Sequence, residues 1–158
     1  MILLTGASGG IGNFLFKEMS KKEFVIGLVN KSKLEQIDNS KVKKLNLTSE
    51  QEIKEFIIDN KLLFKNITLI HMATKSLDGL LSNYDINDLR ETFEINVFAN
   101  FTLTKHILPL MISQRWGRII HVSSVVSEGT IGAGAYASSK SALIGYSKTL
   151  AKEYGRFN

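Results

Sequence analysis

Hydrophobic positions along the chain alternate between short continuous runs and helical spacing. Five short apolar runs have the length and composition of buried strands, at 2–4, 24–29, 42–47, 67–71 and 117–123. Between them lie segments with the spacing of amphipathic helices, namely the stretch that ends at Ser20 and then 51–59, 85–113 and 135–154. This alternation predicts an α/β fold, a Rossmann-type doubly wound parallel sheet with helices on both faces.

Local signals refine these elements. Ser49 followed by Glu52 predicts a capping box ahead of the second helix, and Asp85 is a candidate N-cap for the third. His71, at the end of the fourth strand, is expected to be structural. Asn96 is a polar residue inside the long helix; it either faces solvent or bonds locally, or it holds water or backbone in register beside a site.

A glycine-rich turn, Thr5-Gly-Ala-Ser-Gly-Gly-Ile-Gly12, stands directly between the first strand and the first helix. This arrangement is typical of dinucleotide binding. Gly6 would permit the tight turn, Gly10 would let the backbone approach a pyrophosphate, and Gly12 would let helix and strand pack closely. The pyrophosphate would rest on the free amides of the helix N-terminus.

The end of the second strand bears on the choice of cofactor. An acidic side chain there would accept hydrogen bonds from the ribose 2′-hydroxyl of NAD. The sequence instead runs Val29-Asn30-Lys31-Ser32-Lys33, a polar and basic corner suited to a 2′-phosphate. This favours NADP(H) over NAD(H).

Candidate acid/base chemistry lies between His121 and Lys140. Tyr136 and Lys140 are four residues apart at the start of a helical run, so both lie on one helix face. A free tyrosine titrates near pH ~10, and making it acidic at neutrality requires about 4 kcal/mol. One cation ~4 Å away at an effective dielectric of ~20 supplies about that much. Ser123 or Ser124 could then hydrogen-bond the substrate oxygen. In a parallel sheet, these serines and the glycine turn lie on the same rim.

Composition excludes or disfavours several other classes of protein. The chain has 158 residues, of which 44% are hydrophobic and 22% charged, as expected for one domain over 1–158. The absence of cysteine excludes disulfides and thiolate metal sites, and no metal site is expected. No apolar run approaches ~18 residues, so no membrane partner is expected and a cytoplasmic location is the default. The net charge is +5, but no aromatic residues are interleaved with the basic ones in a way that suggests base stacking. Binding of nucleic acid is therefore not expected.

Several motifs together resemble the short-chain dehydrogenase/reductase family: TGASGGIG at 5–12, Asn96, HVSS at 121–124 and YASSK at 136–140. The stretches GRIIHVSSVV and YASSKSALIGYSKTLAKE are most similar to the 3-oxoacyl-(acyl-carrier-protein) reductase branch. The resemblance implies hydride transfer between a nicotinamide and a ketone, either a small molecule or a carrier-bound thioester.

The resemblance also implies residue roles. Tyr136 would be the proton donor and acceptor, and Lys140 would lower its pKa and bind the nicotinamide ribose. Ser124, preferred to Ser123 because it precedes Val125-Val126, would orient the carbonyl, and Asn96 would support a water relay. The residues implied in cofactor binding are Thr5, Gly6, Ser8, Gly10, Ile11, Gly12, Asn30, Lys31, Asn46, Leu47, Ala73, Tyr136 and Lys140.

The chain departs from the family pattern in four ways. His71-Met72-Ala73-Thr74 replaces Asn-Asn-Ala-Gly, and Asn46 replaces the usual acid after strand three. Gly9 stands where many NADP enzymes have arginine, which argues against NADP. Family members continue with a sixth and a seventh strand, so we expect 1–158 to be an incomplete domain whose fifth strand forms an apolar edge.

Other functions and partners stay open. The alternatives are a dinucleotide-binding module without turnover, such as a truncated inactive paralogue, and a sugar-nucleotide epimerase or dehydratase. The spacing of Gly6, Gly9 and Gly12 also suits the latter. The family implies a homodimer or homotetramer built on its two longest helices. Arg115 is either a contact for an acidic carrier protein or a plain surface arginine.

Overall fold

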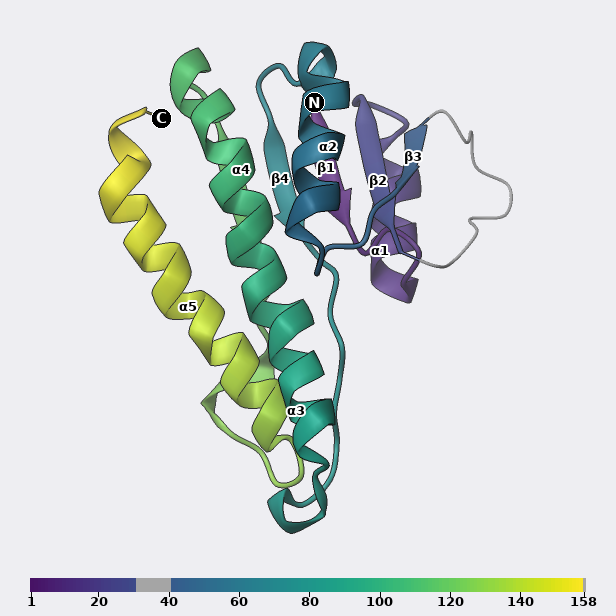
Figure 1. Cartoon of the computed structure of the whole chain (residues 1–158), viewed down its shortest axis with the longest axis vertical. Helices are drawn as coiled ribbons and strands as arrows, with labels where there is room; N and C mark the ends of the chain where they lie inside the picture. The colour runs from purple at the N-terminus through teal and green to yellow at the C-terminus, as the bar shows by residue number, and fades with distance from the viewer. Residues whose placement is uncertain (31–40, 158) are drawn as a thin grey trace.

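A five-stranded parallel sheet forms the centre of the computed structural model, which describes residues 1–30 and 41–157 (Figure 1). The strand order is β3-β2-β1-β4-β5, so the predicted fold class is confirmed. The strands are β1 (Ile2–Thr5), β2 (Val25–Val29), β3 (Val42–Lys44), β4 (Thr68–His71) and β5 (Arg118–His121). In the central strand, Ile2 pairs with Val25 on one side and with Thr68 on the other.

The third strand is shorter than the predicted run 42–47. It ends at Lys44 because the chain then enters a turn around Asn46. The Asn46 Oδ1 accepts hydrogen bonds from the N–H and the hydroxyl of Thr48, at 3.2 and 2.9 Å. Such a side-chain turn competes with extended backbone and ends the strand.

Helices connect the strands, as the apolar spacing predicts. They are α1 (Gly10–Met19), α2 (Glu50–Asn60), α3 (Ile86–Phe93), α4 (Ala99–Gln114) and α5 (Gly134–Tyr154). Short 3-10 turns occupy Lys61–Leu63, Leu81–Asn83, Val125–Glu128 and Gly155–Phe157. The predicted helix 85–113 is α3 and α4 joined by a π-helical turn, Glu94–Phe98. Because a π turn holds an extra residue, it shifts which side chains face inward.

The predicted caps are borne out in part. The Asp85 carboxylate accepts the N–H of Asn87 at 2.7 Å, and the Ser49 hydroxyl accepts the N–H of Glu52 at 3.2 Å. A capping box also requires the Glu52 carboxylate to accept the N–H of Ser49, and this part of the prediction is wrong. The carboxylate accepts the N–H of Asn46 instead, at 3.1 Å. That bond ties α2 to the loop after β3.

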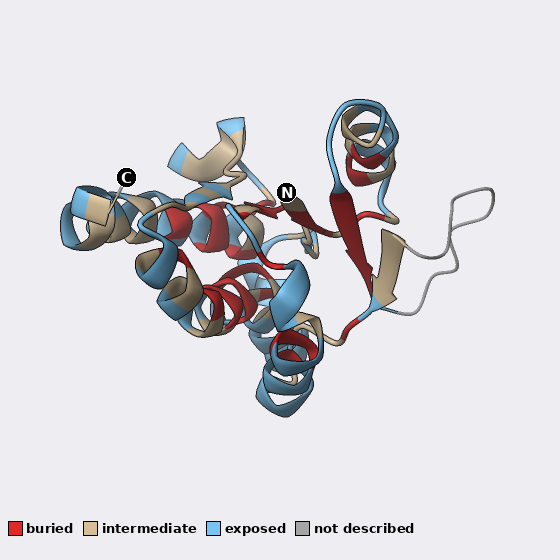
Figure 2. Cartoon of the chain, turned by 90° about the horizontal axis from the view of Figure 1, so that it is seen from above, coloured by how far each residue is buried: buried red, intermediate tan, exposed pale blue. Residues whose placement is uncertain are grey.

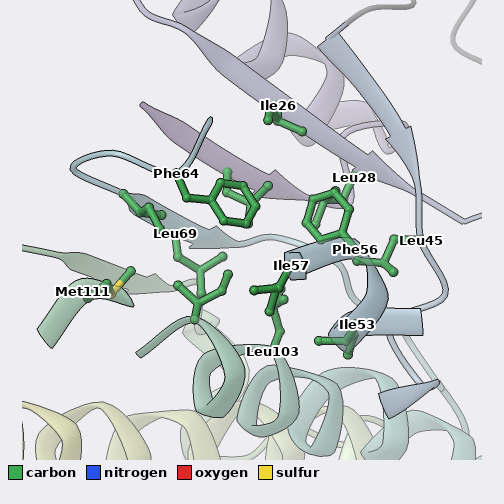
Figure 3. Close-up of a cluster of buried hydrophobic side chains, with 13 residues drawn as sticks. Ile26, Leu28, Leu45, Ile53, Phe56, Ile57, Phe64, Leu69, Leu103 and Met111 are labelled. Atoms are coloured by element: carbon green, nitrogen blue, oxygen red, sulfur yellow. The ribbon is translucent and has the colours of Figure 1, made fainter. Parts of the chain in front are cut away.

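Apolar side chains fill both faces of the sheet. On one face, α2 and α4 pack against the strands through Ile53, Phe56 and Leu103 (Figure 3). On the other face, Phe16 of α1 packs with Leu4, and Gly27 leaves room for the Phe16 ring. Figure 2 shows the buried residues concentrated in the central strands and on the helix faces turned toward them. Helices on both faces rigidify the strand ends, where the glycine turn and the serines lie.

The fifth strand is at the edge of the sheet, and α5 packs against it. The start of α5 also lies against α3 (Figure 1). Ile120 is 45% exposed on this strand. A groove of about 370 Å³ runs beside it, lined by apolar residues that include Met111, Trp116 and Leu150. Among the helices in 1–30 and 41–157, none has the length and apolar character that a bilayer crossing needs.

Candidate cofactor cleft and active site

The glycine turn is fixed by close backbone approaches. Gly6 has φ of 68°, and a Cβ there would lie 2.7 Å from Ala73 Cα. At Gly12 a Cβ would collide with the carbonyl oxygen of Gly6. The Thr5 hydroxyl accepts the N–H groups of Met72 and Ala73, at 2.9 and 3.0 Å. These contacts lock the turn after β1 to the segment after β4.

The start of α1 has the features of a phosphate site. Its N-cap, Gly9, contributes no side-chain hydrogen bond, and no acidic residue stands in the first turn. A Cβ at Gly10 would meet nothing within 4 Å, so the backbone there is open to an incoming group. Because the amides and dipole at a helix N-terminus attract anions, a pyrophosphate fits this turn.

A cleft of about 730 Å³ lies beyond the carboxyl ends of β1, β2, β3 and β4. Six of the predicted cofactor residues line it, namely Gly6, Ser8, Asn30, Asn46, Leu47 and Ala73. Thr5 and Gly12 are instead buried within the turn, and Gly10 and Ile11 are exposed at the start of α1. Lys31 lies outside the described residues. The volume suits a small-molecule or cofactor site.

The far side of the cleft was not predicted. Arg90, Glu91 and Glu94 line it from α3 and the π turn, together with Thr48. A helical pattern shows which residues are polar, and it does not show that a polar face borders a cavity. Asn46 lines the same cleft, but its Oδ1 is already bonded to Thr48.

Asn96 is fully buried and joins three segments. Its Oδ1 accepts the N–H of Lys75 at 2.7 Å and the hydroxyl of Thr74 at 3.0 Å. Its Nδ2 donates to the carbonyl of Lys75 at 2.8 Å and to the Ser139 hydroxyl at 2.9 Å. Of the alternatives weighed from the sequence, the observed one is that Asn96 holds backbone in register.

Tyr136 and Lys140 lie together at the start of α5. The Lys140 side chain is nearly buried, and its Nζ donates to the carbonyl of Val122 at 2.8 Å. This Nζ lies 5.6 Å from the centroid of the Tyr136 ring. Burial lowers the pKa of Lys140. The Ser139 hydroxyl, which Asn96 contacts, donates to the Tyr136 carbonyl at 2.7 Å. Asn96, Tyr136 and Lys140 therefore belong to one connected unit.

The two candidate serines have different surroundings. The Ser123 hydroxyl donates to the carbonyl of Lys140 at 3.1 Å and so anchors α5 to the end of β5. The Ser124 hydroxyl accepts the N–H of Val126 at 3.4 Å and caps the following turn. Within the described residues the Ser124 hydroxyl forms no hydrogen bond with Tyr136 or Lys140. These three side chains do not line the cleft of about 730 Å³.

Ser139 was missed as a positioning residue, although a signal was present. Ala135, Ser139 and Leu143 recur at helical spacing and are all buried. A hydroxyl on the buried face of a helix needs a partner. Asn96 provides it from 43 positions away.

Two histidines, at the ends of β4 and β5, pack against each other. The His71 and His121 rings stack with centroids 4.8 Å apart. His71 Nε2 lies 3.0 Å from the Thr104 hydroxyl, and His121 Nδ1 lies 2.9 Å from that of Ser147. Burial lowers the pKa of His71 well below its usual value and that of His121 to about 4. Both rings are neutral at neutral pH, in line with the structural role expected of His71.

Several known proteins are similar to this chain in sequence. The family model described as short chain dehydrogenase matches residues 1–158. The 3-oxoacyl-[acyl-carrier-protein] reductases FabG of Rickettsia bellii and Aquifex aeolicus are 33% and 32% identical, over 96% of this chain. Nodulation protein G of a Rhizobium species is 33% identical over 99% of it. The chain spans 65% of the length of the Rickettsia bellii reductase and 66% of the Aquifex aeolicus one.

Solved structures agree with the sequence comparison. A short-chain dehydrogenase from Streptomyces avermitilis superposes with a TM-score of 0.88 at 26% identity, covering 99% of this chain and 61% of that one. A serine dehydrogenase from Escherichia coli superposes with a TM-score of 0.86 at 22% identity over 96% of this chain and 75% of that one, a likeness of fold. By its sequence and by its fold, the chain belongs to the short-chain dehydrogenase family.

Proposed function

We propose that the chain forms the cofactor-binding and acid/base part of an NAD(P)-dependent oxidoreductase that reduces a ketone to an alcohol. The observation that carries the proposal is the buried Lys140, whose Nζ is held by Val122 beneath the Tyr136 ring. A cation fixed beside a phenol stabilises the phenolate that remains after proton transfer. An exposed, freely moving lysine would not do so.

Each residue of the unit, and Ser124 in addition, has a role in this proposal. Tyr136 donates a proton from its hydroxyl to the substrate carbonyl oxygen, and Lys140 stabilises the phenolate. Ser124 donates a hydrogen bond to the same carbonyl oxygen, for which its hydroxyl proton is available. The reduced nicotinamide, when bound, supplies the hydride that the carbonyl carbon accepts. Asn96 holds the segment after β4 against α5.

The glycine turn and the cleft would hold the cofactor. The amides at the start of α1 would bind the pyrophosphate, and the adenosine half would lie between Asn30, Leu47 and Ala73. We favour NADP(H), because Asn30, the last residue that the structure describes after β2, presents an amide and not a carboxylate to the cleft. A test is the ratio of the dissociation constants for NADPH and NADH, which should fall below one.

The substrate we propose is a 3-oxoacyl thioester, in keeping with the names of the reductases that the chain resembles. Arg115, which ends α4 in a left-handed conformation, is a candidate contact for an acidic carrier protein. We further propose that α4 and α5 join two copies of the protein, since Phe98, Phe101 and Ile144 on these helices and the π turn are exposed. Light scattering at known concentration would measure the assembly.

The decisive experiment follows the loss of reduced nicotinamide absorbance with 3-oxoacyl thioesters and small ketones. Tyr136→Phe should lower kcat by about two to four orders of magnitude while the cofactor dissociation constant stays unchanged. Full activity in this variant would refute the role of Tyr136. Cofactor binding without turnover by the wild type would instead indicate a dinucleotide-binding module.

A further inference from the structure

Lys75 directly follows the cleft residues Ala73 and Thr74, and both its backbone and its ammonium are bonded to other parts of the protein. Its backbone N–H and carbonyl are bonded to the Asn96 side chain, at 2.7 and 2.8 Å. Its ammonium forms ion pairs with Glu91 and, at 3.4 Å, with Asp88, both on α3. The side chain is 28% exposed, so most of it lies against the protein.

These contacts make Lys75 a link between the two sides of the cofactor cleft, although Lys75 itself does not line it. Ala73 and Thr74 line one side, and Glu91 lines the other from α3. Thr5 fixes the start of this wall through the N–H groups of Met72 and Ala73. The Lys75–Glu91 pair adds a direct side-chain contact between the far end of the wall and α3, beside the bonds from Asn96 to the Lys75 backbone.

The same pair affects the charge at the cleft, to which the guanidinium of Arg90 also contributes. Glu91 and Glu94 both line it, and a bare carboxylate there would repel an anionic cofactor. The Lys75 ammonium offsets the Glu91 charge from within contact distance. An exposed ion pair contributes little to stability, so the expected effect of this one is on the cleft rather than on folding.

We propose that Lys75 is a positioning residue for the nicotinamide dinucleotide, acting through Glu91 to fix the wall at 73–75 and to neutralise that side of the cleft. This inference rests on the proposed function. Lys75 lies outside the sequence motifs that resemble the family. Its two acidic partners, Asp88 and Glu91, are 13 and 16 positions away, so local sequence does not reveal the ion pairs.

The test measures NADPH dissociation constants by calorimetry in the intact protein. Lys75→Met should weaken binding by about tenfold, the loss expected for one charged contact. Lys75→Arg should bind like the wild type, because it keeps the charge and the reach. Lys75→Glu should bind most weakly, and the charge swap Lys75→Glu with Glu91→Lys should recover most of that loss. Lys21→Met is the matched control, since it removes an exposed lysine–glutamate pair at the far end of α1.

Two outcomes of the binding measurements would overturn the proposal. One is a Lys75→Met variant that binds NADPH as tightly as the wild type, and the other is a charge swap as weak as Lys75→Glu alone. Hydrogen exchange of the amides at 73–75 gives a readout without cofactor, and it should quicken in Lys75→Met and not in Lys21→Met. Wild-type protein that binds neither NADPH nor NADH would refute the proposed function, whereas unchanged amide exchange would refute the role of Lys75 by itself.

Discussion

The ammonium of Lys140 donates a 2.8 Å hydrogen bond to the carbonyl oxygen of Val122, directly after the end of β5. This bond crosses from a helix to the end of a strand and fixes the cation at one point. The Ser123 hydroxyl donates to the Lys140 carbonyl at 3.1 Å, so the side chain of Lys140 is bonded to Val122 and its backbone to the neighbouring Ser123. The position of the cation beside Tyr136 is thus set by the edge strand of the sheet.

Lys140→Met should remove the cation and keep most of the packing. We expect kcat to fall by about 100-fold or more, because the phenolate of Tyr136 loses its stabilising charge. The free energy of unfolding should change by less than about 2 kcal/mol, since the desolvation cost of a buried ammonium disappears together with one hydrogen bond. Steady-state kinetics and urea unfolding measure the two effects. Lys148→Met, an exposed lysine on the same helix, is the control and should leave both unchanged.

Asn96→Ala should destabilise the protein by about 2–4 kcal/mol, because the backbone N–H and carbonyl of Lys75 both lose their buried partner. Ser139→Ala removes only one of the Asn96 contacts and should cost about 1 kcal/mol. Urea denaturation of the two variants compares them. An Asn96→Ala variant no less stable than Ser139→Ala would show that the bonds to Lys75 contribute nothing.

Gly10→Ala and Gly12→Ala should behave in opposite ways. A Cβ at Gly12 collides with the Gly6 carbonyl, so this variant should lose about 2 kcal/mol or more of stability. A Cβ at Gly10 meets open space, and alanine there should leave stability unchanged or raise it by about 0.5–1 kcal/mol. If the pyrophosphate approaches at Gly10, the same alanine should nevertheless weaken cofactor binding about tenfold. Thermal unfolding and calorimetry separate these effects, and unweakened binding in Gly10→Ala would place the phosphate elsewhere.

The free energy of unfolding should decrease as the pH is lowered below the ordinary pKa of histidine. The folded protein keeps His71 and His121 neutral, with the pKa of His121 at about 4, whereas the unfolded chain takes up protons near pH 6.5. Since the unfolded state then binds more protons, unfolding is favoured as pH drops from 6.5 toward 4. We expect a loss on the order of 2 kcal/mol from His121 over that window.

His121→Gln provides the check, because glutamine cannot take up a proton. Urea unfolding at several pH values between 6.5 and 4 should show a shallower dependence in this variant than in the wild type. Equal slopes would mean that His121 titrates alike in the folded and unfolded chains. Among the residues that the structure describes, none bonds the buried Nε2 of His121, and glutamine can also change this desolvation cost. The slope and not the absolute stability is therefore decisive.

The fold could be predicted from the sequence because its signals are local. Apolar runs give the strands, helical spacing gives the helices, and the alternation of the two requires parallel strands. Gly6 and Gly12 could be assigned to a tight turn, and Asp85 to a cap, because each acts on backbone a few residues away. The proximity of Tyr136 to Lys140 could be predicted for the same reason, since it depends on one turn of helix.

The tertiary structure decided the contacts that join distant segments. Apolar spacing predicts one helix over 85–113 and does not show the π turn that carries Asn96, nor that its partners are Lys75 and Ser139, 21 and 43 positions away. The same holds for the stacked His71 and His121 and for the cleft wall made by Arg90 and Glu91. The physical reason is that a hydrogen-bonded or stacked partner is chosen by where folding brings the backbone. Local periodicity fixes only which face of an element is buried, not which group it meets there.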